Sequence, residues 1–320
     1  MSVVKLVAVI PAYNAAGTIQ HVLGEIPMNV GRIIVVDDGS RDETSAIVEQ
    51  CAQTDSRIVL IRHEQNRGVG GAMVTGYERA LEIGASVVVK IDADGQMPLA
   101  MLPALIKPLI SGEADYVKGN RFRDFQAIRR MPFVRRLGNV IISFLAKAAT
   151  GYWHCFDPAN GFVAIRGEVL AQLPLQKIDP SYFFEISMLS HLYLLGAVVE
   201  EHPMPARYNG EASSLSIPRV IGQFPGRLLR VLLRRLILKN YVYDFSVESV
   251  ELAAAIPLLS FGLIFGGYNW WWYAKHHIGA PVGTVALAAV AVILGFQSLL
   301  AAVALDLQSI PDEPINSGPL

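Results

Sequence analysis

The chain has 320 residues, enough for roughly two domains of about 150 residues each. Apolar residues make up 52% of it and charged residues 17%, whereas soluble proteins contain about 25% charged residues. This composition excludes a disordered chain and argues against a purely soluble protein. The two cysteines, Cys51 and Cys155, are too few for a disulfide framework or a zinc site, so we expect reduced thiols in a cytosolic compartment.

The net charge of −1 is the sum of three different regions. Residues 1–120 contain 10 Lys and Arg against 14 Asp and Glu, residues 121–250 contain 16 against 10, and residues 251–320 contain 1 against 4. The chain therefore has an acidic first part, a basic middle section and a nearly uncharged last part. We expect an anionic partner at the basic section, and no nucleic-acid partner.

The first 120 residues alternate between short apolar runs and helical patterns. Runs typical of strands lie at residues 4–10, 32–36, 57–61, 86–91 and 115–118, and helical patterns lie near residues 18–25, 43–53, 71–83 and 99–110. Such alternation predicts a mostly parallel sheet covered by helices on both faces. Ligands of parallel sheets bind beyond the carboxyl ends of the strands, so we expect a site at that edge.

Polar motifs stand at four of these strand ends: Pro11-Ala12-Tyr13-Asn14, Asp37-Asp38-Gly39-Ser40, Asn66–Gly71 and Asp92-Ala93-Asp94-Gly95-Gln96. Alone, the second could be a helix-capping turn and the third a glycine-rich loop without a ligand. The fourth is more specific, because Asp92 and Asp94 repel each other unless a cation lies between them. Mg²⁺ and Mn²⁺ take oxygen ligands, and Gln96 offers a third. The motif therefore predicts a divalent metal site.

Two amphipathic helices are predicted in the basic section. Residues 133–150 place three basic residues against an apolar face, namely Arg135, Arg136 and Lys147. Residues 212–243 contain no acidic residue, and four arginines there share one stripe of a helix: Arg219, Arg227, Arg230 and Arg234. This second helix resembles one lying in a membrane interface, and we expect Pro225-Gly226 to break it into two pieces. The first is equally consistent with an ordinary core helix.

The last part of the chain predicts a membrane hairpin. Lys275 is the only charged residue between Leu252 and Leu305, and residues 252–274 and 281–305 each exceed the ~20 apolar residues that cross a bilayer. Aromatic side chains, which prefer the headgroup layer, cluster at the end of the first stretch: Tyr268, Trp270, Trp271, Trp272 and Tyr273. The basic flank before the hairpin predicts that both termini are cytoplasmic. A homo-oligomer through Gly262, Gly266 and Gly267 is left open.

Together these motifs resemble family 2 glycosyltransferases with the GT-A fold, and more narrowly the dolichol-phosphate mannose synthase group and other polyprenyl-phosphate glycosyltransferases. Further matches are Gly119-Asn120-Arg121, Asp157-Pro158-Ala159-Asn160-Gly161-Phe162, Arg207-Tyr208 and Gly210-Glu211. The resemblance implies an α/β, Rossmann-like GT-A domain over residues 1–215 and interfacial amphipathic helices over 216–250. It also implies a two-helix transmembrane hairpin over 251–306 and a cytoplasmic tail over 307–320. We expect an integral protein of a cell membrane or ER-type membrane, with its catalytic domain in the cytoplasm.

The resemblance also assigns roles to individual residues. The donor nucleotide would lie against Pro11, Tyr13, Asn14, Asp37, Asp38, Asp92, Ala93 and Arg207. Mg²⁺ or Mn²⁺ would be held by Asp94, Gln96 and Asp92. The candidate catalytic residues are Asp94, Arg121 and Asp157, and the acceptor phosphate would be bound by Arg121, Arg135 and Arg136. Glu185 could order this site or have a purely structural role.

Two departures from the family pattern leave the donor open between GDP-mannose and a UDP-hexose such as UDP-glucose. Ala15 stands where the family has an acidic residue, and Gly210-Glu211-Ala212-Ser213-Ser214 lacks the lysine of the usual stretch. Base recognition and phosphate binding therefore differ from the usual pattern at these two places.

The expected reaction is the inverting transfer of one hexose from a nucleotide sugar to a polyprenyl phosphate, dolichyl or undecaprenyl, at the cytoplasmic face. A hydroxyl acceptor would need a general base, whereas a lipid monophosphate has a second pKa of about 6 and is largely dianionic at pH 7. The arginines of the basic section can screen the repulsion between the two anionic groups. Two alternatives stay open: a membrane-anchored glycosyltransferase with a non-lipid saccharide acceptor, and a non-catalytic scaffold that binds nucleotide sugars.

Overall fold

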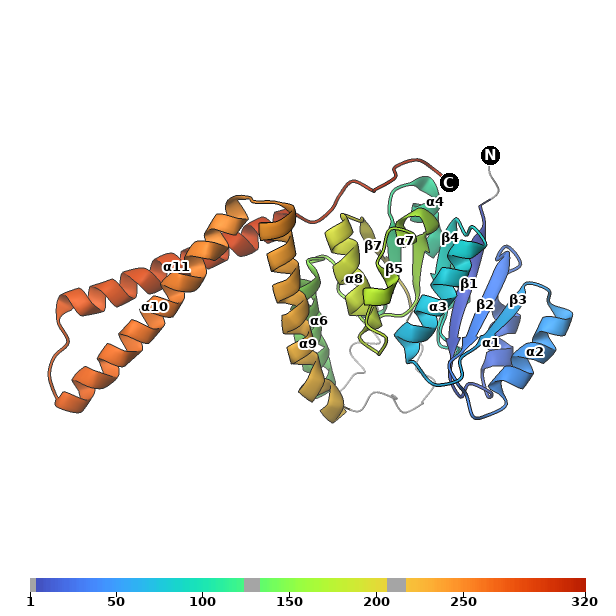
Figure 1. Ribbon diagram of the computed structural model, residues 1–320, viewed down its shortest axis with the longest axis horizontal. Coiled ribbons are helices and arrows are strands. Elements are labelled where there is room, and N and C mark those ends of the chain that lie inside the picture. Colours follow the sequence, from blue (N-terminus) through green and yellow to red (C-terminus); the bar gives the residue numbers. More distant parts are fainter. Residues whose placement is uncertain (1–3, 124–132, 206–216) are drawn as a thin grey trace. The chain divides into compact units, whose positions relative to one another are not determined.

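The computed structural model describes residues 4–123, 133–205 and 217–320 (Figure 1). The chain divides into two compact units, the first formed by residues 1–232 with 311–320 and the second by residues 233–310. The four polar motifs of the predicted site all belong to the first unit. The predicted four-part division, with boundaries after residues 215, 250 and 306, stays a prediction.

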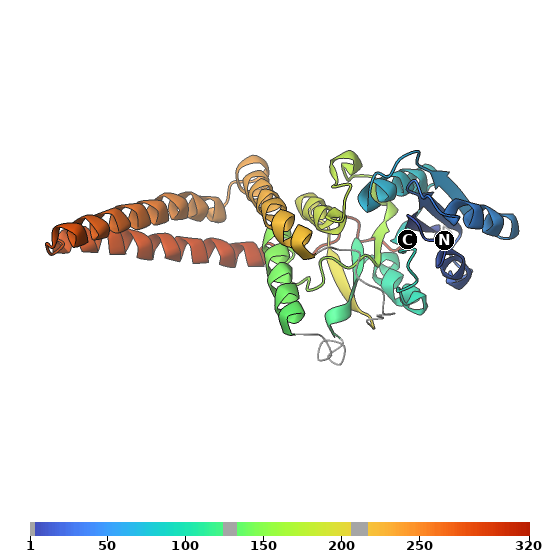
Figure 2. The ribbon, with the colours of Figure 1, turned by 90° about the horizontal axis from the view of Figure 1, so that it is seen from below.

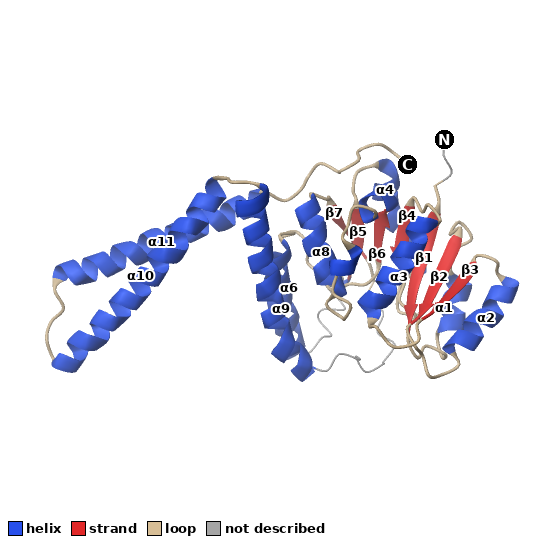
Figure 3. Ribbon diagram, viewed as in Figure 1, coloured by secondary structure: helices blue, strands red, loops and turns tan. Residues whose placement is uncertain are grey.

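One sheet of seven strands runs through the first unit, in the order β3-β2-β1-β4-β6-β5-β7 (Figure 3). The strands are β1 (Leu6–Ala12), β2 (Arg32–Asp37), β3 (Ile58–Arg62), β4 (Val87–Lys90), β5 (Tyr116–Asn120), β6 (Val163–Arg166) and β7 (Val199–Pro203). The pairs β3-β2, β2-β1, β1-β4 and β5-β7 are parallel, while β6 is antiparallel to both of its neighbours. This confirms the mostly parallel sheet predicted from the alternating pattern, and adds β6 and β7 to the predicted strands.

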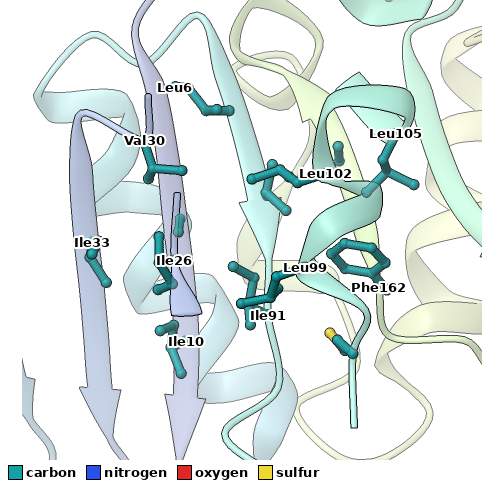
Figure 4. Close-up of a cluster of buried hydrophobic side chains, with 14 of the residues drawn as sticks. Leu6, Ile10, Ile26, Val30, Ile33, Ile91, Leu99, Leu102, Leu105 and Phe162 are labelled. Atoms are coloured by element: carbon teal, nitrogen blue, oxygen red, sulfur yellow. The ribbon is translucent and has the colours of Figure 1, made fainter. Parts of the chain in front are cut away.

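Helices cover both faces of the sheet. They are α1 (Ile19–Glu25), α2 (Thr44–Thr54), α3 (Val69–Glu82), α4 (Leu102–Ser111, preceded by the 3-10 turn Leu99–Met101), α6 (Phe133–Thr150), α7 (Gly167–Leu170) and α8 (Phe184–Leu195). The main core lies on one face, where Ile10 of β1 and Leu102 of α4 belong to one buried cluster (Figure 4). On the other face Gly76 lets α3 approach Val9 and Val36 closely. Burial on both faces explains why the strands are almost continuously apolar.

A smaller cluster joins α6, α8 and the middle of α9 (Ile217–Ile237). The residues buried there are Ala146, Ala149, Phe183, Ile186 and Leu228. The opposite side of α6 carries exposed apolar side chains, namely Val140, Ile141, Phe144 and Leu145. The helix is therefore amphipathic as predicted, with one face in a core and the other uncovered. Whether the uncovered face meets a membrane stays a prediction.

Helix α9 runs without a break from Ile217 to Ile237, with Pro225 inside it. The expected break at Pro225-Gly226 is therefore wrong. A proline removes one backbone hydrogen bond, and a helix can accommodate this by bending. Phe224 and Leu228, on either side of the proline, pack against the α6–α8 cluster. These contacts help to hold the helix across the weak point.

The second unit contains two long helices, α10 (Val247–His276) and α11 (Val282–Gln308), which lie side by side (Figures 1 and 2). Among the described residues, these are the helices long and apolar enough to cross a membrane. In their most apolar 18-residue stretches only 11% and 17% of the residues are buried. Trp270 and Trp271 expose 77% and 54% of their surface near the end of α10. The two helices correspond to the predicted hairpin, and α10 begins five residues before the predicted stretch.

Buried ion pairs join the base of the two long helices to the end of α9. Arg235 donates to both carboxylate oxygens of Asp306, at 2.6 and 2.9 Å. Lys239, in the π-helical turn Leu238–Tyr243, donates to Glu248 of α10 at 2.7 Å and to Asp306 of α11 at 2.8 Å. Two cations of the basic flank are therefore structural parts of the second unit.

Candidate active site

The first two polar motifs meet at the carboxyl edge of β1 and β2. The register pairs Ala12 of β1 with Asp37 of β2. Beyond these ends, the Asn14 N–H donates to Ser40 Oγ at 2.9 Å, and the Arg41 N–H donates to Asn14 Oδ1 at 2.9 Å. Asn14 has a φ of 51°, a left-handed conformation that asparagine adopts more readily than most residues. The two loops thus fix each other, as expected for motifs of one site.

Three residues of the predicted donor surface lie at this edge. Tyr13 exposes 48% of its surface, and Pro11 is half-buried. Ala93 is buried, and its carbonyl oxygen accepts a hydrogen bond of 2.6 Å from the hydroxyl of Thr18, which ties the fourth motif to the first. The exposed Tyr13 ring offers an apolar face on which a base could stack. The donor contacts of these residues stay predictions.

Asp37 and Asp38 are buried and hold the surrounding loops. Asp37 accepts a hydrogen bond from the Ser40 N–H at 2.9 Å and another from the Ser45 hydroxyl. The two oxygens of Asp38 accept hydrogen bonds from backbone N–H groups of the third motif, from Arg67 at 2.9 Å and from Gly68 at 2.8 Å. A ring nitrogen of His63 lies 2.7 Å from the same carboxylate. Asp38 therefore anchors the glycine-rich loop, and its predicted donor contact stays a prediction.

The fourth motif separates its two carboxylates. Asp94 is exposed, and its Oδ1 accepts a hydrogen bond from the Gln96 N–H at 2.9 Å. Asp92 is half-buried, and its Oδ1 accepts a hydrogen bond of 2.6 Å from Lys90 Nζ. Lys90 also donates to Glu185 Oε1 at 3.0 Å. Burial alone would lower the pKa of Lys90, but the carboxylates of Asp92 and Glu185 outweigh it and raise that pKa, so the lysine stays charged.

Arg121 and Asp157, both predicted to be catalytic, are partners of each other. Arg121 Nε lies 2.8 Å from Asp157 Oδ2, and its Nη2 lies 3.0 Å from Oδ1, which is a two-pronged ion pair. Asp157 is almost fully buried, while the Arg121 side chain is 37% exposed. Burial alone would raise the pKa of Asp157, but the hydrogen bonds and charge of Arg121 outweigh it and lower that pKa. The pair presents a fixed guanidinium at the end of β5.

Glu201 of β7 also holds the loop that carries Asp157. Its carboxylate accepts hydrogen bonds from the Asp157 N–H at 2.8 Å and from the Asn120 side chain at 2.5 Å. Asn160 donates to Asp157 Oδ2 at 3.3 Å. The Asp157–Phe162 motif is therefore tied to β5 and β7, and Glu201 is the partner that the sequence pattern did not indicate.

The profile of glycosyl transferase family 2 matches residues 7–173, more than half of the chain, and these residues include all four strand-end motifs and the Arg121–Asp157 pair. The chain belongs to this family. An N-acetylglucosaminyltransferase of Methanococcus voltae, named for UDP-N-acetylglucosamine and dolichyl phosphate, is 35% identical over 181 residues, 52% of this chain and 72% of the relative. The polyprenol monophosphomannose synthase of Mycolicibacterium smegmatis is 30% identical over 210 residues, 62% of this chain and 76% of the relative.

Solved structures agree on the fold of this glycosyltransferase. Glucosyl-3-phosphoglycerate synthase from Mycobacterium tuberculosis, in complex with Mn²⁺, UDP-glucose and phosphoglyceric acid, superposes with a TM-score of 0.52 at 24% identity. The match covers 72% of this chain and 79% of that one. At this identity the likeness shows the fold alone. It confirms the predicted GT-A architecture.

Some predicted residues of the glycosyltransferase lie where the structure gives no side-chain description. Arg207 lies outside the described residues, as do Tyr208, Gly210 and Glu211. Arg135 and Arg136 belong to the first turns of α6, at positions whose side chains are not described. Their roles at the donor and acceptor phosphates stay predictions.

The residues present fit a divalent cation that is bound together with the donor. The described residues contain no group of three or more His, Cys, Asp or Glu that would hold a metal unaided. Asp94 and Gln96 supply side-chain oxygens at the edge of the sheet, and Asp92 is already paired with Lys90. Mg²⁺ is typically held by one or two carboxylates, with phosphate oxygens of the substrate and waters completing its shell. The predicted ion therefore needs the donor diphosphate as a further ligand.

Proposed function

We propose that this glycosyltransferase is a membrane-bound inverting enzyme that transfers one hexose from a nucleotide sugar to a polyprenyl phosphate. The observation that carries the proposal is that one chain joins a family 2 domain to two helices long and apolar enough to cross a membrane. An enzyme with a lipid acceptor works at a membrane surface, which explains this combination. Relatives named for dolichyl phosphate and for polyprenol support the same acceptor class.

The donor site is proposed at the edge formed by the four motifs. Tyr13 and Pro11 would contact the base, and Asp94 with Gln96 would hold a divalent cation, which neutralises charge on the leaving diphosphate. The donor is a nucleotide sugar with GDP or UDP, since relatives named for UDP-N-acetylglucosamine and for mannose are similarly related to the chain. The exposed Tyr13 ring tolerates either base, because stacking uses the face that all bases share.

The acceptor site is proposed beside the Arg121–Asp157 pair. Asp157 holds Arg121 by two hydrogen bonds, so the guanidinium needs little ordering when a phosphate arrives. Arg121 can then align the lipid phosphate for attack on the face of the sugar opposite the diphosphate, and this direct displacement inverts the anomeric carbon. No general base is required, because the phosphate is already largely dianionic at pH 7. Arg135 and Arg136 are proposed as further cations for this phosphate.

The catalytic domain and both termini are proposed to lie in the cytoplasm. The exposed Arg230 and Arg234 precede α10, and Lys275 is the only charged residue between Leu252 and Leu305. Basic residues accumulate on the cytoplasmic side of membrane spans. Two spans then return the chain to the side on which it started.

The decisive experiment offers a panel of nucleotide sugars to membranes that contain the full chain, with undecaprenyl or dolichyl phosphate as acceptor. We expect one labelled hexose to appear on the lipid, with release of one nucleoside diphosphate. Transfer to free saccharides but not to lipid would overturn the acceptor and favour the membrane-anchored enzyme with a saccharide acceptor. Donor binding without release of nucleoside diphosphate from any acceptor would favour the scaffold.

A further inference from the structure

Lys90 is a charged residue inside an otherwise apolar strand. It ends β4, whose other residues are Val87, Val88 and Val89, and its side chain is 2% exposed. Burying an ammonium group is costly unless anionic or polar partners surround it. The position of Lys90, two residues before Asp92, therefore calls for partners that compensate this cost.

Three acceptors from three separate elements surround the ammonium group. Its Nζ lies 2.6 Å from Asp92 Oδ1, 3.0 Å from Glu185 Oε1 in the first turn of α8, and 3.4 Å from the carbonyl oxygen of Gly161. A lysine ammonium has three hydrogens to donate, so these partners match its capacity. Lys90 thus links the fourth motif, α8 and the Asp157–Phe162 motif.

The backbone at Gly161 packs directly against the Lys90 ammonium group and the Asp92 carboxylate. A Cβ atom at this position would lie 2.4 Å from Lys90 Nζ and 2.6 Å from Asp92 Oδ2, closer than real Cβ contacts. Any side chain here would push the lysine or the aspartate out of place. The glycine of the Asp157–Phe162 motif is therefore needed for the Lys90–Asp92 contact.

The ion pair with Lys90 gives Asp92 an electrostatic environment different from that of Asp94. The repulsion between Asp92 and Asp94 is relieved at Asp92 by a cation of the protein itself. Asp92 Oδ1 is paired with Lys90, and Asp94 lies exposed beyond the strand end, where its Oδ1 accepts the Gln96 N–H. A metal ion is therefore not required to explain the position of Asp92.

We propose that Lys90 is a positioning residue of the donor site, which fixes and neutralises Asp92 so that Asp94 and Gln96 present their oxygens to the cation and the donor diphosphate. This rests on the proposed donor site at residues 92–96. Glu185 belongs to the same arrangement, because it accepts a second hydrogen bond from the same ammonium group. A role for Glu185 in ordering the site follows from this geometry.

The test replaces Lys90 by methionine, an unbranched side chain one atom shorter, which removes the charge and keeps most of the apolar stem. UDP and GDP, each with Mn²⁺, are titrated calorimetrically into the detergent-solubilised full chain. In K90M, Asp92 and Glu185 face each other without a cation, so Asp92 should move and nucleotide affinity should fall about 10- to 100-fold, as is usual for residues that support a metal site. With a competent donor, KM for the donor should rise more than kcat falls.

A double variant separates electrostatics from packing. Lys90→Met combined with Glu185→Gln removes one carboxylate with the ammonium and so restores the net charge of the group. It should bind nucleotide at least roughly threefold more tightly than K90M, because residues in direct contact couple. If K90M does not fold, the double variant still tests the proposal, which then requires nucleotide affinity about tenfold below that of the wild type.

Lys118 provides the matched control. It is an equally buried lysine on β5, and its Nζ has no hydrogen-bond partner within the described part of the chain. Lys118→Met should leave nucleotide affinity within about twofold of the wild type. Wild-type affinity in K90M, or an equal loss in K118M, would overturn the role of Lys90.

The two proposals fail separately. If the wild type binds nucleotide with Mn²⁺ but transfers no sugar to lipid, the acceptor class is wrong and a weakened K90M still supports the role of Lys90. If the wild type transfers sugar to lipid and K90M binds and reacts like it, the role of Lys90 alone is wrong.

Discussion

Three carboxylates of the candidate site, Asp92, Asp94 and Asp157, differ in their surroundings. Asp92 is paired with Lys90, Asp157 is paired with Arg121, and Asp94 lies exposed at the strand end. A buried carboxylate with its own cation is part of the scaffold, because removing it leaves a charge without a partner. An exposed carboxylate stays in contact with solvent, so a ligand can reach it without unfolding the loop. Substitutions at Asp94 and Asp157 should therefore have different consequences.

Replacing Asp94 by alanine should abolish chemistry and leave the fold intact. We expect at least a ~100-fold loss of sugar transfer, because the cation on the diphosphate loses its principal protein ligand. Thermal unfolding of the metal-free variant should match that of the wild type, since the side chain is exposed. Glu82→Gln, at an exposed carboxylate of α3, is the control and should retain full transfer. Full activity of the Asp94 variant with a chelator present would contradict the metal assignment.

Replacing Asp157 by asparagine should cost stability in a pH-dependent way. At pH 7 the free energy of unfolding should fall by about 1–3 kcal/mol, because charge-assisted hydrogen bonds to Arg121 become neutral. The pKa of Asp157 is lower in the folded than in the unfolded chain, so its stabilising contribution is present above about pH 4 and is lost as the pH falls through the folded pKa. The difference between variant and wild type in chemical denaturation should therefore shrink on acidification.

The exposed pair of Glu49 and Arg62 is the control for this experiment. Their side chains are 57% and 52% exposed, and such pairs contribute little to stability. Glu49→Gln should change the free energy of unfolding by less than about 0.5 kcal/mol at any pH between 3 and 7. A difference at Asp157 that stays constant over this range would show that its charge is not what stabilises the loop.

At the scale of elements, the sequence predicted those helices and strands whose own residues form a clear apolar pattern. The strands β1 to β5, the helices that follow the first four of them and the two long apolar helices agree with the predicted ranges to within a few residues. Strands β6 and β7 have only four and five residues, and β7 is mostly polar, so they offered little periodicity. Pro225 is a strong local signal for a helix break, but α9 continues through it because its tertiary contacts outweigh that signal.

The candidate site was predictable in its motifs but not in its partners. The four strand-end motifs follow from topology, because parallel neighbours end at the same edge. The contact of Lys90 with Glu185 joins residues 95 apart in the chain, and no spacing indicates it. A lysine in an otherwise apolar strand, two residues before Asp92, was the one available signal. The pairing of Arg121 with Asp157 likewise needs the loop geometry between β5 and β6.

The close packing of α10 on α11 makes a prediction about glycines. A Cβ at Gly262 would lie 2.7 Å from Val292 Cγ2 and 2.9 Å from the Val292 backbone nitrogen, whereas one at Gly267 would meet nothing within 4 Å. Gly262→Leu should therefore force the helices apart and destabilise the hairpin by about 1–3 kcal/mol. Gly267→Leu gains the same helix propensity without the clash and should be tolerated. Thermal unfolding of the two variants in detergent compares them, and equal loss in both would contradict this packing.

For the whole molecule, the near-zero net charge results from separate local balances. Cations of the basic section are paired inside their own units: Arg121 with Asp157 and Arg227 with Asp179 in the first, Arg235 and Lys239 with Asp306 and Glu248 in the second. The excess of basic residues over residues 121–250 is therefore only partly available to an anionic ligand. The C-terminal residues 311–320, which follow α11, belong to the first unit.

These C-terminal residues should matter for the stability of the catalytic domain. The Ile315 N–H donates to the buried Asp115 Oδ2 at 3.0 Å, although the two residues are 200 positions apart, and Arg166 Nη2 donates to the Gly318 carbonyl at 3.0 Å. Ile315→Pro removes the first donor and leaves the Asp115 carboxylate less satisfied, which should cost about 1–3 kcal/mol. Ile315→Val is the control: it keeps the N–H and shortens the side chain by one methylene, which should cost less than about 1 kcal/mol. Hydrogen exchange at Val198, whose N–H shares Asp115 Oδ2, should accelerate in the proline variant, and unchanged exchange would mean that residues 311–320 do not support the sheet.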